Sequence, residues 1–156
     1  MPSQSLVVSL HIAAHGAAPM QSVSIVTAVA GRGLEGDRYF SQTGTYSNHP
    51  STGRPVTLIE NEAIEALARE YAVHLGAGLA RRNLVTRGVA LNHLVGKTFA
   101  AGAVVLRGTR LCEPCLHLEK LSVKGAARGL IHRGGLRAEI VKGGVIRVGD
   151  AIAVID

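Results

Sequence analysis

The sequence predicts a mainly-β α+β fold: a single barrel-like domain over residues 1–156, with one main amphipathic helix at about 61–75. Three observations lead to this fold class. Short runs rich in β-branched residues recur along the chain, separated by Gly and Pro. One segment has helical periodicity. No internal repeat divides the 156 residues, of which 47% are apolar, so one domain with its own core is expected.

The first half of the chain predicts three strands and two loops. "SLVVSLHIAA" (5–14), "SVSIVTAVA" (22–30) and "RPVTLIE" (54–60) are β-branched apolar runs that read as strands. "GRGLEGDRY" (31–39) has three glycines in its first six residues and is expected to form a shaped loop. The polar stretch 41–53 lacks periodicity and is long for a loop inside a domain, as functional or mobile loops often are.

The predicted helix is "NEAIEALAREYAVHLG". Asn61 is expected to cap its N-terminus and Gly76 to end it. Its apolar stripe follows the i, i+3, i+4, i+7 pattern and consists of Ile64, Leu67, Ala68 and Tyr71.

The second half of the chain predicts further strands, within 81–89, 97–111 and 136–155. Gly143 and Gly144 separate two alternating runs in the last of these, a pattern typical of a tight hairpin. "CLHLEKLS" (115–122) is expected to form a short helical turn.

Composition excludes several classes of protein. Aromatic residues are only 3% of the chain, too few for the stacking platforms of single-stranded nucleic-acid binders. No run of about 18 apolar residues is present, and the N-terminus lacks the basic start of a signal peptide. Two cysteines do not make a disulfide scaffold, so we expect a protein of the reducing cytoplasm. From the aromatic content and the apolar runs, we expect no nucleic-acid or membrane partner.

Charge is unevenly distributed. Residues 1–79 hold four Arg and six acidic residues, a net charge of −2, whereas residues 80–149 hold thirteen basic and three acidic residues, a net charge of +10. The basic residues are spread singly through apolar strands, which favours a concave anion site over a nucleic-acid-binding tail. A solvated surface is the alternative for most of them.

The only cysteines, Cys112 and Cys115, form a C-x-x-C pair. A structural zinc site needs four ligands, but there is no second cysteine pair, and His11 and His15 fall in a predicted strand and the loop after it. A thioredoxin-type pair needs a βαβ setting that this chain lacks, and the carboxylate of Glu113 would raise a neighbouring thiol pKa.

The two cysteines differ in their surroundings. Cys112 ends an apolar strand and fits a small core position. Cys115 follows Pro114 in a neighbourhood of basic residues, which favours the thiolate that binds a soft metal or attacks as a nucleophile. The residues alone leave open whether Cys115 is functional. Its basic neighbours in the sequence are Arg107, Arg110, Lys120 and Lys124.

Two further segments carry candidate binding residues. Arg81, Arg82 and Asn83 enter a predicted strand and offer bidentate donors for a phosphate together with an amide, although an exposed strand start has the same composition. In the loop 31–39, Gly36 allows close backbone approach, and Asp37 and Arg38 are able simply to pair with each other. No dinucleotide fingerprint or P-loop is present.

"HRGGLRAEI" (132–140) is the last candidate motif. Gly134 and Gly135 could hold an anion in a backbone nest or form a turn. His132 could donate a proton beside them or be structural.

Taken in order, these motifs resemble the MOSC domain, named after the C-terminal part of molybdenum cofactor sulfurase. The resemblance rests on "GRGLEGDRY", "VTLIENEAIEAL", "RRNLVTRGVALNHLVGKTFAAG", "CEPCLHL" and "HRGGLRAEIVKGGVIRVGD". It runs from about Val7 to the end of the chain and is closest to the short stand-alone bacterial members. It implies a β-rich, barrel-like fold.

The resemblance also implies a cofactor and its ligands. In members that bind molybdenum cofactor (molybdopterin), a nearly invariant cysteine ligates the metal, and its match here is Cys115. The family's Arg and Asn after the helix match Arg81 or Arg82 and Asn83, which are expected to hold the phosphate and the pterin. The loop of Gly36, Asp37 and Arg38 corresponds to the family's glycine-aspartate-arginine loop.

The match departs from the family at two positions. Tyr39 stands where other members often carry His, so the resemblance does not carry a proton-transfer role to it. Cys112 lies outside the shared pattern, which makes the C-x-x-C spacing accidental.

These observations support two main functions. The first is an enzyme that reduces N-hydroxylated small molecules, with electrons from a separate reductase. The second is a sulfur carrier that holds a persulfide on Cys115, received from a sulfur donor. A non-enzymatic anion- or nucleic-acid-binding barrel is the third alternative. Pyridoxal phosphate is associated with the wider family, but none of the four lysines lies in a recognisable Schiff-base site.

Overall fold

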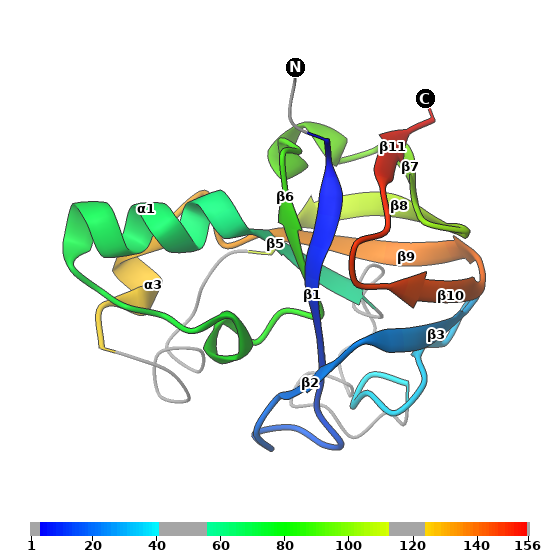
Figure 1. Ribbon diagram of the computed structural model, residues 1–156, viewed down its shortest axis with the longest axis horizontal. Coiled ribbons are helices and arrows are strands. Elements are labelled where there is room, and N and C mark those ends of the chain that lie inside the picture. Colours follow the sequence, from blue (N-terminus) through cyan, green and yellow to red (C-terminus); the bar gives the residue numbers. More distant parts are fainter. Residues whose placement is uncertain (1–3, 41–55, 113–123, 156) are drawn as a thin grey trace.

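The computed structural model describes residues 4–40, 56–112 and 124–155. This described part is mostly β, with one main helix and one short helix that lie beside the sheets (Figure 1). The larger sheet has eight strands in the order β11-β7-β8-β9-β5-β6-β1-β2, and the smaller has three in the order β10-β3-β4. The strands of the first half are β1 (Leu6–Ile12), β2 (Gln21–Val23), β3 (Ile25–Val29), β4 (Gly33–Leu34) and β5 (Val56–Glu60).

The described chain after β5 contributes the remaining elements. Its strands are β6 (Leu84–Arg87), β7 (Thr98–Ala101), β8 (Val104–Leu111), β9 (Leu136–Lys142), β10 (Gly144–Arg147) and β11 (Ile152–Val154). The helical elements are α1 (Asn61–Tyr71), the 3₁₀ helices η1 (Ala77–Ala80) and η2 (Leu91–Leu94), and the short α3 (Ala126–Gly129).

The mainly-β α+β class is confirmed, but a barrel is not. The described strands form two open sheets, and an isolated bridge between Leu6 and Ala151 links β1 to the chain just before β11. The run 22–30, which suggested one strand, is divided at Ser24. Its first part pairs with β1 in the larger sheet, and its second pairs with β10 in the smaller one.

The predicted hairpin at Gly143 and Gly144 is wrong. Strand β9 pairs with β8 and β5, whereas β10 pairs with β3, so the chain passes between the two sheets at these glycines. A Cβ at Gly143 would lie 2.6 Å from the carbonyl oxygen of Ala28, so close backbone contact explains a glycine there as well as a turn would.

Helix α1 ends at Tyr71, earlier than the sequence suggested. Ala72 takes a left-handed conformation with φ 54°, and its N–H donates to the carbonyl of Ala68 at 3.1 Å. The early end turns the chain back, so that Leu75 packs into the cluster under the helix. Asn61 is the first helical residue rather than the cap, because Glu60 takes the cap position.

The buried face of α1 is also shifted from the predicted stripe. Ala63, Ala66 and Leu67 are buried, whereas Tyr71 is 46% exposed. The periodicity identified the helix, but the sheet contacts determine which side of it is covered.

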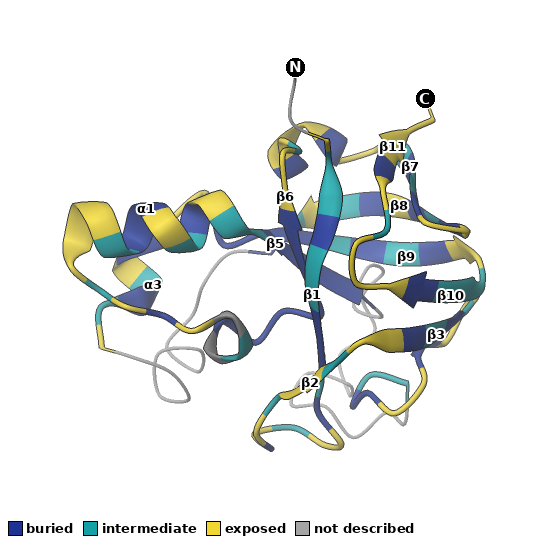
Figure 2. Cartoon of the chain, in the orientation of Figure 1, coloured by how far each residue is buried: buried dark blue, intermediate teal, exposed yellow. Residues whose placement is uncertain are grey.

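The core has two parts, visible as the dark blue segments of Figure 2. The larger cluster fills the space enclosed by the two sheets, and includes Leu10, Leu58, Leu84 and Leu136. The smaller cluster lies between the opposite face of the larger sheet and α1, and includes Ile59 and Val85. Alternate residues of β5 and β6 therefore serve different clusters, as the two-residue period of a strand requires.

The predicted loop 41–53 and the predicted turn 115–122 lie outside the described residues. Within the described ranges, no helix has the length and hydrophobicity that crossing a membrane requires.

Candidate functional site

The sheet face that packs against α1 becomes polar near the start of two parallel strands. On β5, Thr57 lies two residues before Ile59 and faces the same side, and Asn83 takes the same place relative to Val85 beside β6. The strand registers continue these positions into a row across five neighbouring strands, which we call the polar row. It consists of Arg110, Arg137, Thr57, Asn83 and His11.

Asn83 lies between Thr57 and His11 in the polar row and is fully buried. Its side-chain oxygen accepts hydrogen bonds from the N–H and hydroxyl of Thr57, at 3.0 and 3.2 Å. Its amide nitrogen donates to the carbonyl of His11 at 3.1 Å. Asn83 therefore joins strands β1 and β5 at the floor of the site, and these protein contacts occupy much of its hydrogen-bonding capacity.

Arg82 is buried and bonds to three backbone carbonyls. Its Nε donates to Gly134 at 2.8 Å, and its two Nη atoms donate to Cys112 at 3.1 Å and to Ala80 at 3.3 Å. The side chain therefore ties together the chain before β6, the chain after β8 and the chain before β9. These hydrogen bonds to three carbonyl oxygens stabilise the buried positive charge of Arg82.

Arg81 is also buried, but the structure uses few of its donors. One Nη donates to the carbonyl of Ala18 at 2.7 Å, and the backbone is left-handed with φ 57°. Burial lowers the pKa of Arg81, and the nearby positive charge of Arg38 lowers it further. The structure thus holds a guanidinium where the charged form is disfavoured.

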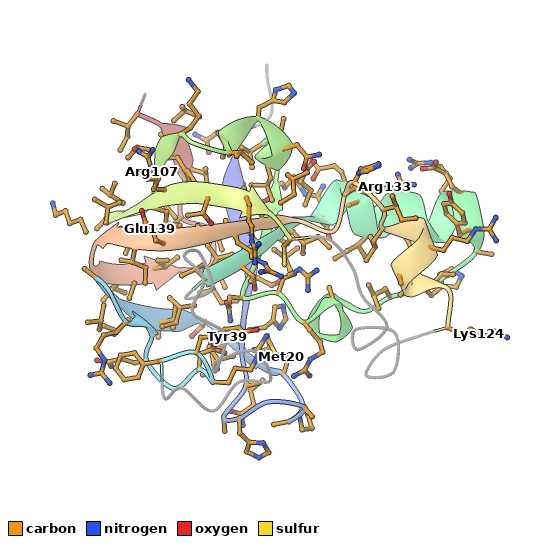
Figure 3. All side chains as sticks on the ribbon, turned by 180° about the vertical axis from the view of Figure 1, so that it is seen from behind. Met20, Tyr39, Arg107, Lys124, Arg133 and Glu139 are labelled. Carbon is orange, nitrogen blue, oxygen red and sulfur yellow. The ribbon has the colours of Figure 1, made fainter. Side chains whose placement is uncertain are left out.

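The glycine-rich loop places Asp37 and Arg38 against this site. The carboxylate of Asp37 accepts from the N–H of Ala13 at 3.0 Å and from Arg38 at 3.2 Å. Arg38 also donates to the carbonyl of Arg81 at 3.3 Å and to the sulfur of Met20 at 3.3 Å. Its guanidinium lies 4.7 Å from the ring centre of Tyr39, close to Met20 in Figure 3.

Arg38, Arg81 and Arg82 therefore form one buried group, which we call the arginine cluster. Among the described residues, the carboxylate paired with the cluster is that of Asp37, bonded to Arg38. Burying a charge without a counter-ion is costly. Two of the three cations lack a described carboxylate partner, so the cluster is suited to an anion.

The structure places some of the other predicted site residues beside the arginine cluster and one of them elsewhere. Gly134 and Gly135 are buried beside the arginine cluster, where the carbonyl of Gly135 accepts from the N–H of Cys112 at 2.7 Å. His132 is exposed, and its carbonyl accepts from the side chain of Asn92 at 2.8 Å. The contacts described for His132 do not bring it to the cluster.

Cys112 is buried, as expected for a small core residue at the end of β8. Cys115, the predicted metal ligand, lies outside the described residues. Within the part of the chain that the structure describes, no group of three or more His, Cys, Asp or Glu residues is placed to hold a metal ion.

His11 is a site residue that the sequence suggested only as a rejected zinc ligand. It is 5% exposed, its Nε2 lies 2.9 Å from the hydroxyl of Ser9, and its Nδ1 has no hydrogen-bond partner among the residues that the structure describes. Burial lowers its pKa below the ordinary 6.5. A histidine between apolar residues of a strand was the available signal, but only the strand register places it beside Asn83.

We expect His11 to make the protein less stable in mild acid. The lowered pKa means that the unfolded chain takes up a proton at this ring before the folded protein does, so stability falls as the pH drops below about 6.5. One such proton contributes at most about 1.4 kcal/mol per pH unit. Urea unfolding at several pH values should show this component in the wild type and lack it in His11→Gln. An equal pH slope in both proteins would contradict the assignment.

The fold and the site together define the class of protein: it is mainly β, with a buried, cation-rich site on its larger sheet. The chain belongs to the MOSC domain family, whose model matches residues 45–153. A comparison with curated proteins finds no match.

Solved structures show the same fold. YuaD from Bacillus subtilis superposes with a TM-score of 0.81 at 16% identity, covering 97% of this chain and 96% of that one. YiiM from Geobacillus stearothermophilus gives 0.72 at 14% identity, covering 97% and 75%. YiiM from Escherichia coli gives 0.68 at 16% identity, covering 99% and 71%.

Proposed function

We propose that the protein binds molybdenum cofactor and reduces N-hydroxylated small molecules. Cys115 is the protein ligand of the metal, and the arginine cluster holds the anionic end of the cofactor. In this reaction the N–O bond breaks, a separate reductase supplies two electrons, and two protons complete the amine and water. The free buried thiol of Cys112 is compatible with the reducing cytoplasm as the place of this reaction.

The observation that carries the proposal is the charge of the arginine cluster. Arg81 donates one described hydrogen bond, to Ala18, and its pKa is lowered by burial and by the nearby positive charge of Arg38. A phosphate accepts several hydrogen bonds from guanidinium groups and supplies the missing negative charge. The donor set therefore fits the phosphate of a molybdopterin.

The backbone next to Cys115 is anchored at the same cluster. The N–H of Cys112 is held by Gly135, and its carbonyl is held by Arg82. Cys115 is three residues further along the chain, and three residues of chain span at most about 10 Å between Cα atoms. A soft thiolate beside a phosphate site suits one metal ligand added to those that the cofactor brings.

The protein's own residues have binding and positioning roles in this proposal. Arg81 and Arg38 bind and neutralise the anion, Arg82 fixes the backbone on which Cys115 and Gly134 depend, and Asp37 orients Arg38. When bound, the cofactor supplies a metal centre that exchanges electrons with the substrate.

Metal and pterin content of the purified protein tests this function. Protein from cells that make molybdenum cofactor should contain close to one molybdenum per chain, and Cys115→Ala should lose it because the metal's protein ligand is gone. Cys112→Ala is the matched control, since its side chain lies in the core, and it should keep the metal. Elemental analysis and pterin fluorescence are the measurements.

Each outcome assigns a different function. Full molybdenum in Cys115→Ala would contradict the assignment of the ligand. No molybdenum or pterin in the wild type would contradict the cofactor function. A persulfide on Cys115 after treatment with a cysteine desulfurase would then support the sulfur carrier, and steeply salt-dependent DNA binding would support a nucleic-acid-binding domain.

A further inference from the structure

Two buried side-chain nitrogen atoms among the described residues have no hydrogen-bond partner: His11 Nδ1 and Arg137 Nη1. An unsatisfied buried polar atom costs about 1–3 kcal/mol, so native proteins contain few of them. Both atoms belong to the polar row, His11 on β1 and Arg137 on β9. Because both atoms belong to one row, we infer that a group outside the described residues supplies the missing hydrogen-bond partners there.

The surroundings of His11 define what that group is. A Cβ built on Gly78 would lie 3.7 Å from His11 Nδ1, so this nitrogen faces the 3₁₀ helix η1. The carbonyl of Gly78 accepts from the N–H of Arg81 at 3.3 Å, which places His11 at the border of the arginine cluster. The positive charges of the cluster favour a negatively charged hydrogen-bond acceptor at this position.

The protonation of His11 suits such an acceptor. Its Nε2 lies 2.9 Å from the hydroxyl of Ser9, which is able to donate to that nitrogen. If Ser9 donates, the ring proton is on Nδ1, and the unpartnered atom is a donor. Since burial favours the neutral ring, one ring proton is available to a ligand.

The wall beside His11 consists of Gly78 and one adaptable side chain, that of Met20. The same Cβ position on Gly78 lies 4.0 Å from Met20 Cβ, so both residues lie close to the His11 ring. Met20 is unbranched and flexible, and its sulfur already contacts Arg38. A small movement of Met20 would admit an oxygen atom to His11 Nδ1 without a change in the backbone.

We propose that His11, in its Nδ1–H tautomer, donates a hydrogen bond to an anionic oxygen of the ligand held by the arginine cluster, between Gly78 and Met20. This deepens the proposed function and rests on it only in that the cluster binds an anion. His11 is then a binding residue that contacts the ligand from β1. In the polar row it lies on one side of Asn83, and Arg137 lies on the other.

Gly78→Ala blocks this contact while leaving the His11 side chain in place. Its Cβ makes only ordinary contacts, at 3.7 Å or more, and no left-handed backbone is involved, so the variant should fold as the wild type does. Gly76→Ala is the matched control two residues away, where an added Cβ meets nothing within 4 Å.

The probe is inorganic phosphate, followed by NMR of ¹⁵N-labelled histidine rings in ligand-free protein. We expect the His11 ring to show the Nδ1–H tautomer, and phosphate to shift its signal in the wild type and in Gly76→Ala. Gly78→Ala should bind phosphate about tenfold more weakly by this signal, a difference of about 1.4 kcal/mol. An Nε2–H tautomer would overturn the proposal, as would equal phosphate binding by the two alanine variants.

Retained pterin separates this inference from the proposed function. If purified wild type holds no pterin while phosphate still shifts His11, the cofactor function fails and the His11 contact stands. If the wild type and Gly78→Ala hold pterin equally and phosphate does not shift His11, the contact fails and the cofactor function stands.

Discussion

Replacing Arg82 by Met should lower the free energy of unfolding by at least about 3 kcal/mol. Methionine keeps most of the side-chain volume but leaves the carbonyls of Ala80, Cys112 and Gly134 without their donor. Each buried carbonyl left unsatisfied costs about 1–3 kcal/mol, and removing one partner of a buried charged contact is worse than replacing both. Urea unfolding, monitored by circular dichroism, is the measurement.

Arg81→Met is the matched control for Arg82→Met. Arg81 donates a single described side-chain hydrogen bond, to Ala18, so its loss should change the unfolding free energy by less than about 1 kcal/mol. Retained pterin should nevertheless fall at least tenfold, because the anion loses a guanidinium partner. Equal destabilisation by the two variants would show that Arg82 has no special structural role.

Replacing Gly135 by Ala should have a comparable effect on stability. The backbone has φ +116°, which residues with a side chain rarely adopt, and a Cβ would collide with the carbonyl oxygen of Leu58 on β5. Relief of the collision must separate β9 from β5 or move the chain away from Arg82. We expect a loss of about 3 kcal/mol or more in urea unfolding, together with loss of retained pterin.

Gly149→Ala separates the collision from the backbone conformation. Gly149 also has a positive φ, +94°, but a Cβ there meets nothing within 4 Å. The cost should therefore be the conformational one alone, about 1–2 kcal/mol. If Gly135→Ala is no more destabilised than Gly149→Ala, the close packing against Leu58 does not determine the choice of glycine.

Most of the fold could be predicted from local pattern. The β-branched runs identified β1 and β5, and the predicted strand segment 97–111 contains β7 and β8, because alternation and punctuation are properties of the strand itself. Strand pairing is not a local property. The glycine pair between β9 and β10 has the composition of a hairpin, but the partners of the two strands lie in different sheets. The open sheets, rather than a barrel, are the same kind of long-range outcome.

The candidate site was predictable to a similar extent. Arg81, Arg82 and Asn83 stood out as polar residues at a strand entry, but the sequence could not assign their partners. The structure directs Arg82 and Asn83 to protein groups and leaves Arg81 with donors to spare. The sequence considered His11 only as a zinc ligand and rejected it, since its place in the site depends on registers across several strands. The binding roles of these residues stay predictions.

The bridge between Leu6 and Ala151 has a consequence for chain architecture. The N–H of Ile152 donates to the carbonyl of Ser5 at 2.9 Å. The start of β1 and the start of β11 therefore lie side by side, as Figure 1 shows. Met20 and Tyr39, which border the arginine cluster, lie in the lower half of the view in Figure 3. Circular permutation through a short linker at this edge, or fusion of another module to either end, should therefore leave the residues of the arginine cluster in place.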